Sequence, residues 1–254
     1  MTSRLEGTVA LVTGASSGIG EATAQQLAAE GAAVVVLARR ADRLQALADR
    51  ITSDGGRVLT IEADVTLESQ VNSAVDRAAS EFGRLDTVVA NAGLMLLGPL
   101  ADADTDEWRQ MIELNVLGLM YTAHAALPHL LSCAGREPRR VADLVLVSSV
   151  AGRVARAGSG AYNATKHAVG AFGEALRQEV TERHVRVSLV EPGAVDTELA
   201  GHNRPEIQAG MRARFGDIQR LAATDISDAI TYIVTRPRHT AINEMLIRPT
   251  QQVG

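Results

Sequence analysis

Tyr162 and Lys166 are the residues of this sequence whose types and spacing most directly suggest proton chemistry. They stand four positions apart in Tyr-Asn-Ala-Thr-Lys, so on a helix the phenol and the ammonium would be neighbours on one face. A tyrosine that exchanges protons near neutral pH needs its pKa of about 10 lowered by two to three units. One positive charge at about 4 Å contributes on the order of 4 kcal/mol at an effective dielectric constant of 20, which approaches the required size. The same spacing also occurs on ordinary solvated helix faces.

A second candidate is the hydroxyl of Ser149. Ser148 and Ser149 stand at the end of an expected strand, and doubly wound sheets bind ligands beyond the carboxyl ends of their strands. Ser149 could therefore donate a hydrogen bond to a substrate oxygen on which charge develops. The alternative is a plain Ser-Ser turn.

A glycine-rich turn follows the first expected strand. Residues 13–20 read Thr-Gly-Ala-Ser-Ser-Gly-Ile-Gly, with Gly14, Gly18 and Gly20 directly before a helical stretch. A turn of this kind lets the backbone approach a pyrophosphate, and the helix N-terminus offers free N–H groups to the anion. Its position between a strand and a helix favours a dinucleotide site over a purely structural turn.

The end of the second expected strand indicates which dinucleotide binds. An acidic residue there holds a ribose 2′-hydroxyl, whereas a 2′-phosphate needs cations. This chain has Ala38 at that position, followed by Arg39 and Arg40, and a guanidinium binds phosphate bidentately. The pattern favours NADP over NAD. The alternatives left open are two arginines that only cap a strand in solvent, and an NAD-linked alcohol dehydrogenase.

Short β-branched runs alternate with longer helical patterns along the chain, and the strands lack polar alternation. Such runs suit strands that are covered on both faces, so we expect an α/β fold: one Rossmann-like, doubly wound domain over residues 1–254 with a mostly parallel seven-stranded sheet and helices on both faces. The expected strands are Val9–Thr13, Ala33–Ala38, Val58–Glu62, Thr87–Ala90, Leu144–Ser148, Val185–Val190 and Met245–Ile247. The expected helices are near Ile19–Glu30, Asp42–Ile51, Glu68–Phe82, Asp104–Leu131, Ala161–Glu182 and Asp225–Thr235. Residues 192–221 show weak periodicity and are predicted to form a substrate lid.

Taken in order, these motifs resemble the short-chain dehydrogenase/reductase family over nearly the whole chain. The residues that carry the resemblance are the turn at 13–20, Asp64-Val65, Asn91-Ala92-Gly93, Asn115, Ser149, the segment 162–166, and Pro192-Gly193 with Thr197. The ending 243–251, with segments 93–99 and 191–193, is similar to the subset containing clavulanic acid dehydrogenase and the serine and 3-hydroxy acid dehydrogenases, which use NADP.

The resemblance implies roles for individual residues. Tyr162 would donate or accept the proton, Ser149 would hold the carbonyl, and Lys166 would bind the nicotinamide ribose and lower the tyrosine pKa. Asn115 would support a water-mediated proton relay. Cofactor contacts would come from Gly14, Ser16, Ser17, Gly18, Ile19, Gly20, Arg39, Arg40, Asp64, Val65, Asn91, Ala92, Gly93, Tyr162, Lys166, Pro192, Gly193, Val195 and Thr197. The resemblance also implies a homotetramer packed through the two long helices.

The substrate side is expected to be apolar. Met95, Val150, Ala151 and Leu199 could line it, together with Leu94, Leu96, Leu97 and Val195, although ordinary core packing is an equal alternative for the leucines. Arg153 could meet a substrate carboxylate or lie in a surface turn, and His202 is a possible substrate contact within the lid. The reaction indicated is reduction of a small ketone or aldehyde, or oxidation of the matching alcohol. A protein that binds the cofactor without turnover is the remaining alternative.

The composition of the chain argues against a membrane protein, a nucleic-acid-binding protein and a metal site. The chain has 254 residues, a formal charge of −5 and one cysteine, Cys133. The longest apolar run, Ala32–Ala38, is too short for a membrane helix, and the acidic balance argues against nucleic acid as partner. The histidines and the single cysteine do not have metal-ligand spacing. We expect no metal, no membrane span and a cytoplasmic location.

Overall fold

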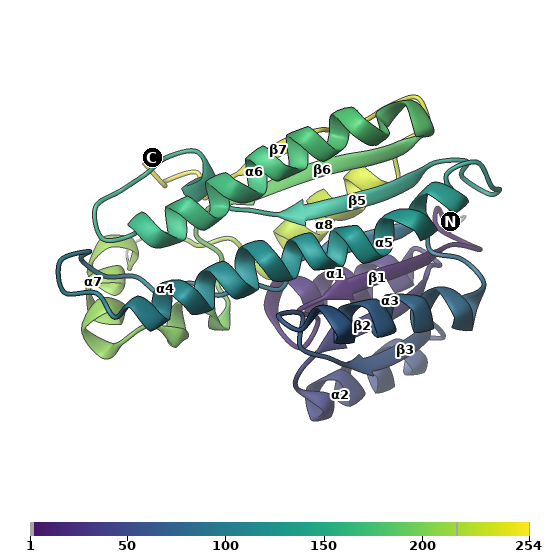
Figure 1. Cartoon of the computed structure of the whole chain (residues 1–254). Helices are drawn as coiled ribbons and strands as arrows, with labels where there is room; N and C mark the ends of the chain where they lie inside the picture. Colours follow the sequence, from purple (N-terminus) through teal and green to yellow (C-terminus); the bar gives the residue numbers. More distant parts are fainter. Residues whose placement is uncertain (1–2, 217, 254) are drawn as a thin grey trace.

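Residues 3–216 and 218–253 are described by a computed structural model, so that Asp217, within the expected lid, lies outside the described residues. Seven parallel strands form a single sheet in the order β3-β2-β1-β4-β5-β6-β7 (Figure 1). Their bounds are β1 Val9–Thr13, β2 Ala33–Ala38, β3 Arg57–Glu62, β4 Thr87–Ala90, β5 Ala142–Val147, β6 Val185–Pro192 and β7 Glu244–Ile247. The prediction of a doubly wound parallel sheet is confirmed.

Helices cover both faces of this sheet. The α-helices are α1 Gly18–Ala29, α2 Ala41–Ser53, α3 Glu68–Phe82, α4 Thr105–Ile112, α5 Leu119–Cys133, α6 Gly160–Val180, α7 Pro205–Phe215 and α8 Ala223–Val234. One core cluster joins α3, α5 and α6 to the sheet, and a second joins α1, α2 and α8 to its other face (Figure 1). Strands β1, β2, β5 and β6 are buried along their whole length, which explains their unbroken apolar sequences.

The strand order reverses direction between β1 and β4. From β1 the chain winds outward through β2 to β3, then returns to β4 and winds the other way to β7. Adjacent crossover connections leave the sheet in opposite directions at this point, and ligands of open α/β sheets bind in the crevice that results. The fold therefore directs attention to the carboxyl ends of β1 and β4.

The long helix expected at Asp104–Leu131 runs from Thr105 to Cys133 but is interrupted by a π-helical segment, η1 Glu113–Gly118. Among the described residues, this helix is long enough and apolar enough to cross a membrane, judged by length and composition alone. Leu119, Ala123 and Leu130 are buried against the sheet, so packing within this fold accounts for its apolar character.

The segment expected to be irregular at 192–221 contains two helices. A short 3₁₀ helix, η4 Glu198–His202, is followed by α7, which begins at Pro205 in the first helical position. Both lie beyond the carboxyl ends of the strands (Figure 1). The periodicity was too weak to predict α7, and the side chains of residues 205–213, the part of this helix whose side chains are described, lie outside both core clusters.

Candidate active site

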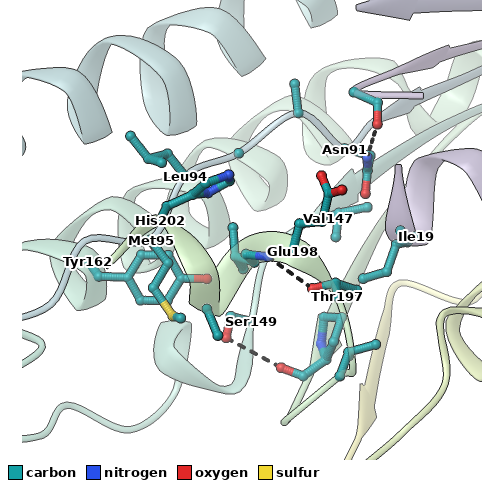
Figure 2. A pocket seen from close by; sticks show the side chains of 18 of the residues that line it. Ile19, Asn91, Leu94, Met95, Val147, Ser149, Tyr162, Thr197, Glu198 and His202 are labelled. Atoms are coloured by element: carbon teal, nitrogen blue, oxygen red, sulfur yellow. Dashed lines mark hydrogen bonds between the residues drawn. The ribbon is translucent and has the colours of Figure 1, made fainter. Parts of the chain in front are cut away.

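A cavity of about 570 Å³ opens at the carboxyl ends of the strands. Residues that follow each of β1 to β6 line it, and η4 and α7 add further residues from the lid side. This volume lies in the range of cofactor and small-molecule sites. Figure 2 shows Ile19 and Asn91 at one end of the cavity and Tyr162, Met95 and His202 at the other.

The backbone of the glycine turn has a conformation that only glycine adopts easily. Gly14 and Gly18 have φ angles of +65° and +57°, a region that favours glycine. A side chain on Gly14 would meet the Cα of Ala92 at 2.8 Å. Gly20 does not line the cavity: a Cβ there would lie 2.4 Å from the carbonyl oxygen of Gly14, so Gly20 serves close packing of α1 on the turn.

Asn91 and Thr13 join the ends of β4 and β1. The Asn91 side-chain amide donates to the carbonyl oxygen of Thr13 at 3.0 Å, and the Thr13 hydroxyl accepts from the backbone N–H groups of Asn91 and Ala92 at 3.0 and 3.1 Å. These bonds hold the glycine turn and the Asn91–Gly93 segment at a fixed separation. The loop that lines the cavity is thus rigid at the reversal of strand order.

The two arginines after β2 have different surroundings. Arg40 donates to the hydroxyls of Ser16 at 2.9 and 3.1 Å and of Ser17 at 2.8 Å, which places its guanidinium at the glycine turn. Arg39 is 72% exposed and lies 3.7 Å from a carboxylate oxygen of Asp64. Both line the cavity, but Arg40 is the one whose position is fixed.

Ser149, Tyr162 and Lys166 come together at the end of β5. Tyr162 and Lys166 are both buried on α6, and the ammonium lies 5.9 Å from the centre of the phenol ring. The Lys166 ammonium donates to the carbonyl oxygen of Val147 at 3.0 Å, and the Ser149 hydroxyl donates to that of Pro192 at 3.3 Å. A phenol, an amine and a hydroxyl therefore line one cavity, and Figure 2 shows two of them, Tyr162 and Ser149.

Burial dominates the titration of these groups. It raises the pKa of Tyr162 to about 12, and a hydrogen bond with Ser149 acts in the opposite direction. Burial lowers the pKa of Lys166 to about 8. The expected lowering of the tyrosine pKa is thus not found in this structure, because removal of the phenolate from water outweighs the favourable contacts. At neutral pH the phenol holds its proton.

Asn115 lies in the π-helical segment and does not line the cavity. Its side chain accepts from the N–H of Leu94 at 2.7 Å, and donates to the carbonyl oxygen of Leu94 at 2.8 Å and to the hydroxyl of Thr165 at 3.2 Å. The wider turn of a π-helix often marks a functional site. Here the Asn115 side chain contacts α6 through Thr165, so that the residue links the loop after β4 to the helix that carries Tyr162 and Lys166.

Asn163 is a site residue that sequence reasoning missed. Its side chain donates to the carbonyl oxygens of Ala151 at 2.7 Å and Val154 at 3.0 Å, and accepts from the Ser159 hydroxyl at 2.7 Å. It therefore fastens the loop after Ser149 to the first turn of α6. Its position next to Tyr162 in the motif was the available signal.

The end of the cavity that we expect to take the substrate, beside Tyr162, has mainly apolar side chains. Met95, Val150, Ala151 and Leu199 line it, and so do Leu94, Leu97 and His202. Leu96 is absent from this lining and its N–H instead faces the sulfur of Met111 at 3.4 Å. Lining residues without a sequence motif include Glu198, Met211, Arg220 and Gln252.

For Arg153, the sequence left open a substrate contact or a surface turn, and the structure gives its side chain another set of partners. Arg153 does not line the cavity, and its guanidinium donates to the buried carboxylate of Glu191 at 2.7 and 2.8 Å and also to Glu244. These two carboxylates raise the arginine pKa and neutralise its charge. The side chain braces the end of β6 against β7.

The other expected cofactor residues line the cavity. With Gly20 set apart, these are Gly14, Ser16, Ser17, Gly18, Ile19, Arg39, Arg40, Asp64, Val65, Asn91, Ala92, Gly93, Tyr162, Lys166, Pro192, Gly193, Val195 and Thr197. Within the described ranges 3–216 and 218–253, no group of three or more histidine, cysteine or acidic residues could hold a metal ion.

Comparison with known proteins places this geometry in a family. Residues 8–208 match the model of the short chain dehydrogenases. An uncharacterised oxidoreductase of Staphylococcus aureus is 36% identical over 241 residues, which cover 95% of this chain and 96% of the relative. A closed form of serine dehydrogenase complexed with NADP+ superposes with a TM-score of 0.88 at 30% identity, covering 97% of each chain. A short chain dehydrogenase/reductase from Burkholderia phymatum in complex with NAD superposes with a TM-score of 0.84 at 26% identity, covering 96% of this chain and 89% of the other.

Proposed function

The chain belongs to the short-chain dehydrogenase family of oxidoreductases, and on that premise we propose that it transfers hydride between NADP(H) and a small carbonyl or alcohol substrate. The observation that carries the proposal is the presence of Ser149, Tyr162 and Lys166 in one cavity with the glycine turn. Proton transfer and dinucleotide binding would then take place side by side.

The cavity suits a dinucleotide on structural grounds. Gly14 and Gly18 leave backbone exposed where side chains would obstruct a pyrophosphate, and α1 begins at Gly18 with its free N–H groups. Arg40 and the hydroxyls of Ser16 and Ser17 supply a cationic, hydrogen-bonding site for a 2′-phosphate, where Ala38 offers no carboxylate for a 2′-hydroxyl. When bound, the reduced nicotinamide supplies the hydride that the chain itself lacks.

The side chains of the site would bind the substrate oxygen and supply its proton. Ser149 would donate a hydrogen bond to the carbonyl oxygen, and Tyr162 would give that oxygen its proton as charge develops there. Because the pKa of Tyr162 is about 12, the phenol is protonated at neutral pH and ready to act as the acid of a reduction. Lys166 would hold the ribose and return a proton toward the tyrosine, with Asn115 supporting the path by which protons reach this buried pair.

An NAD-linked alcohol dehydrogenase is the second candidate. The exposure of Arg39 favours it, since only one of the two predicted phosphate ligands is held in place, and one of the structural relatives binds NAD. A comparison of kcat/KM with NADPH and NADH distinguishes the two candidates. We expect a preference of at least tenfold for NADPH from charged hydrogen bonds of about 1.5–3 kcal/mol.

The experiment that tests the function is a panel of small ketones and aldehydes with NADPH oxidation followed by absorbance. We expect oxidation with at least one member of the panel, and loss of it in Tyr162→Phe. Tight NADPH binding without oxidation by any member would favour a cofactor-binding protein without turnover.

We also propose a homotetramer in the cytoplasm. Ile112 and Leu117 on the long helix, and Leu246 on β7, are exposed apolar side chains that subunit contacts would cover. Other apolar residues of the long helix, among them Ala123 and Ala126, are buried within the chain and pack on the sheet. Light scattering should give four times the chain mass of 26.8 kDa, and a monomer would contradict the proposal.

A further inference from the structure

We propose that Glu198, on the lid, occupies the place of the cofactor 2′-phosphate and competes with it for Arg40 and Arg43. This inference rests on the proposed use of NADP(H). It assigns a role in cofactor selection to two residues, Glu198 and Arg43, that lie outside the motifs of the sequence.

The contacts of Glu198 are those of an anion in a cationic site. One carboxylate oxygen accepts from Arg40 at 2.9 Å, and the other accepts from Arg43 at 2.5 Å. Arg40 is at the same time held by the hydroxyls of Ser16 and Ser17. The carboxylate therefore sits where two guanidinium groups meet at the glycine turn, as a phosphate would.

Glu198 begins η4 and so links the lid to α2. Thr197 caps this helix with its hydroxyl, and its methyl carbon would lie 3.1 Å from a Cβ on Gly18, so this end of the lid rests on the glycine turn. Arg40 precedes α2 and Arg43 lies in its first turn. The link consists of ion pairs between residues that are 158 and 155 positions apart in the sequence.

A 2′-phosphate at Arg40 would bring a second anion against the Glu198 carboxylate. The phosphate and the carboxylate are both negative and would repel each other beside Arg40. The phosphate carries more charge and more acceptor oxygens than the carboxylate. The phosphate should therefore displace Glu198, which frees the start of η4 from α2. A cofactor without the 2′-phosphate leaves the ion pairs in place.

The test measures binding of two non-reactive probes to the full chain, ADP-ribose and its 2′-phosphorylated form. Glu198→Gln keeps the shape of the side chain and removes its charge. We expect it to tighten binding of the 2′-phosphorylated probe about three- to tenfold and to change ADP-ribose affinity less than twofold. Glu174→Gln is the matched control, because Arg177 also lowers the pKa of this exposed carboxylate to about 2, as Arg43 does for Glu198. The control should change neither affinity.

Equal or weaker binding of the 2′-phosphorylated probe by Glu198→Gln would overturn the competition. A failure of the NADP(H) proposal itself is distinct, since it would show as a wild-type protein that binds ADP-ribose as tightly as the 2′-phosphorylated probe. Hydrogen exchange of residues 198–202 gives a second readout that does not depend on a variant. Exchange should be faster with the 2′-phosphorylated probe than with ADP-ribose, and equal or slower exchange would contradict displacement of Glu198.

Discussion

The strand-end side of the cavity and the lid side are held together by different means. At the strand ends, Thr13, Asn91 and Lys166 are tied to backbone carbonyl or N–H groups of the sheet. On the lid side, the tethers to the rest of the chain are mostly side-chain contacts, among them the Glu198 ion pairs, the Asn203 side chain and the ion pair of Arg204 with Glu107, with a bridge between Val195 and Leu221 at the ends of the segment. Within the segment, the Gln208 side chain donates to the carbonyl oxygens of Gly201 and Asn203.

This contrast separates two tasks. The sheet holds the groups that we propose for proton transfer, which must keep a fixed geometry, and backbone positions at strand ends vary little. The lid contributes apolar walls and charged tethers, and on our proposal the tethers exchange partners when a ligand enters. Substitutions at the strand ends should therefore change chemistry, whereas substitutions in the lid should change binding.

The largest effect should come from Tyr162→Phe, which removes the reacting hydroxyl from the strand-end side. We expect turnover with NADPH to fall about a thousandfold or more, because general acid catalysis contributes about 10²- to 10⁴-fold and the buried site offers no other phenol. NADPH affinity should change less than twofold. Tyr232→Phe, on the exposed side of α8, is the control and should retain full activity. Retained turnover in Tyr162→Phe would remove this residue from the mechanism.

The titration of Lys166 tests how strongly the strand-end side excludes water. It is the only lysine in the sequence, so NMR of protein labelled at lysine reports this group directly. Burial should give it a pKa of about 8. A value near 10.5 would mean that water reaches the ammonium.

The same pKa shift predicts how stability depends on pH. Between about pH 8 and 10.5 the folded chain releases this proton while the unfolded chain keeps it, so the free energy of unfolding should rise with pH by about 3 kcal/mol. The measurement is the difference between wild type and Lys166→Met in urea unfolding, which cancels the titration of other groups. A difference that stays constant or falls across this range would contradict the depressed pKa.

Substitutions of Arg40 and Arg39 compare the two candidate phosphate ligands at the cofactor end of the cavity. Arg40→Gln should weaken NADPH binding about 10- to 100-fold, because its guanidinium is positioned by Ser16 and Ser17. Arg39→Gln should have a smaller effect, since this side chain is largely exposed. NADH affinity should change little in either variant. Titration of both cofactors checks this, and the reverse order of effects would assign the phosphate to Arg39.

The smallest effect on activity should come from the lid tether Asn203. This buried side chain accepts from the N–H of Leu97 at 2.7 Å and donates to the carbonyl oxygen of Met95 at 3.0 Å. Asn203→Ala should raise the substrate KM about three- to tenfold and increase proteolysis within residues 204–216, with kcat and NADPH affinity nearly unchanged. Asn72→Ala on the exposed face of α3 is the control. A fall in kcat alone would place Asn203 in the chemistry instead.

What could be predicted from the sequence follows the same division. The glycine turn, Ser149 and the Tyr162–Lys166 pair stand at fixed offsets from strands and helices, so local sequence was enough to place them. Glu198 and Arg43 could not be found in this way, because they meet through chain folding across 155 positions and neither has a local signature. The π-helical turn at Asn115 was also not predicted, since the hydrogen-bond partners of this side chain, Leu94 and Thr165, lie far from it in the sequence.

The pKa of Tyr162 could not be predicted from the spacing to Lys166. The spacing indicates only that the two groups are close enough to interact. The direction of each pKa shift is decided by the burial of both groups, which depends on the whole fold. The cofactor-bound state is where the attraction of positive charges for the phenolate would be largest.

A crystal structure of the protein with NADP+ tests the central claim most directly. The account predicts that the nicotinamide ring lies beside the phenol of Tyr162 and the ammonium of Lys166, with the 2′-phosphate on Arg40 and the Glu198 carboxylate displaced from it. A nicotinamide ring away from Tyr162, or a cavity into which the dinucleotide does not enter, would contradict the account.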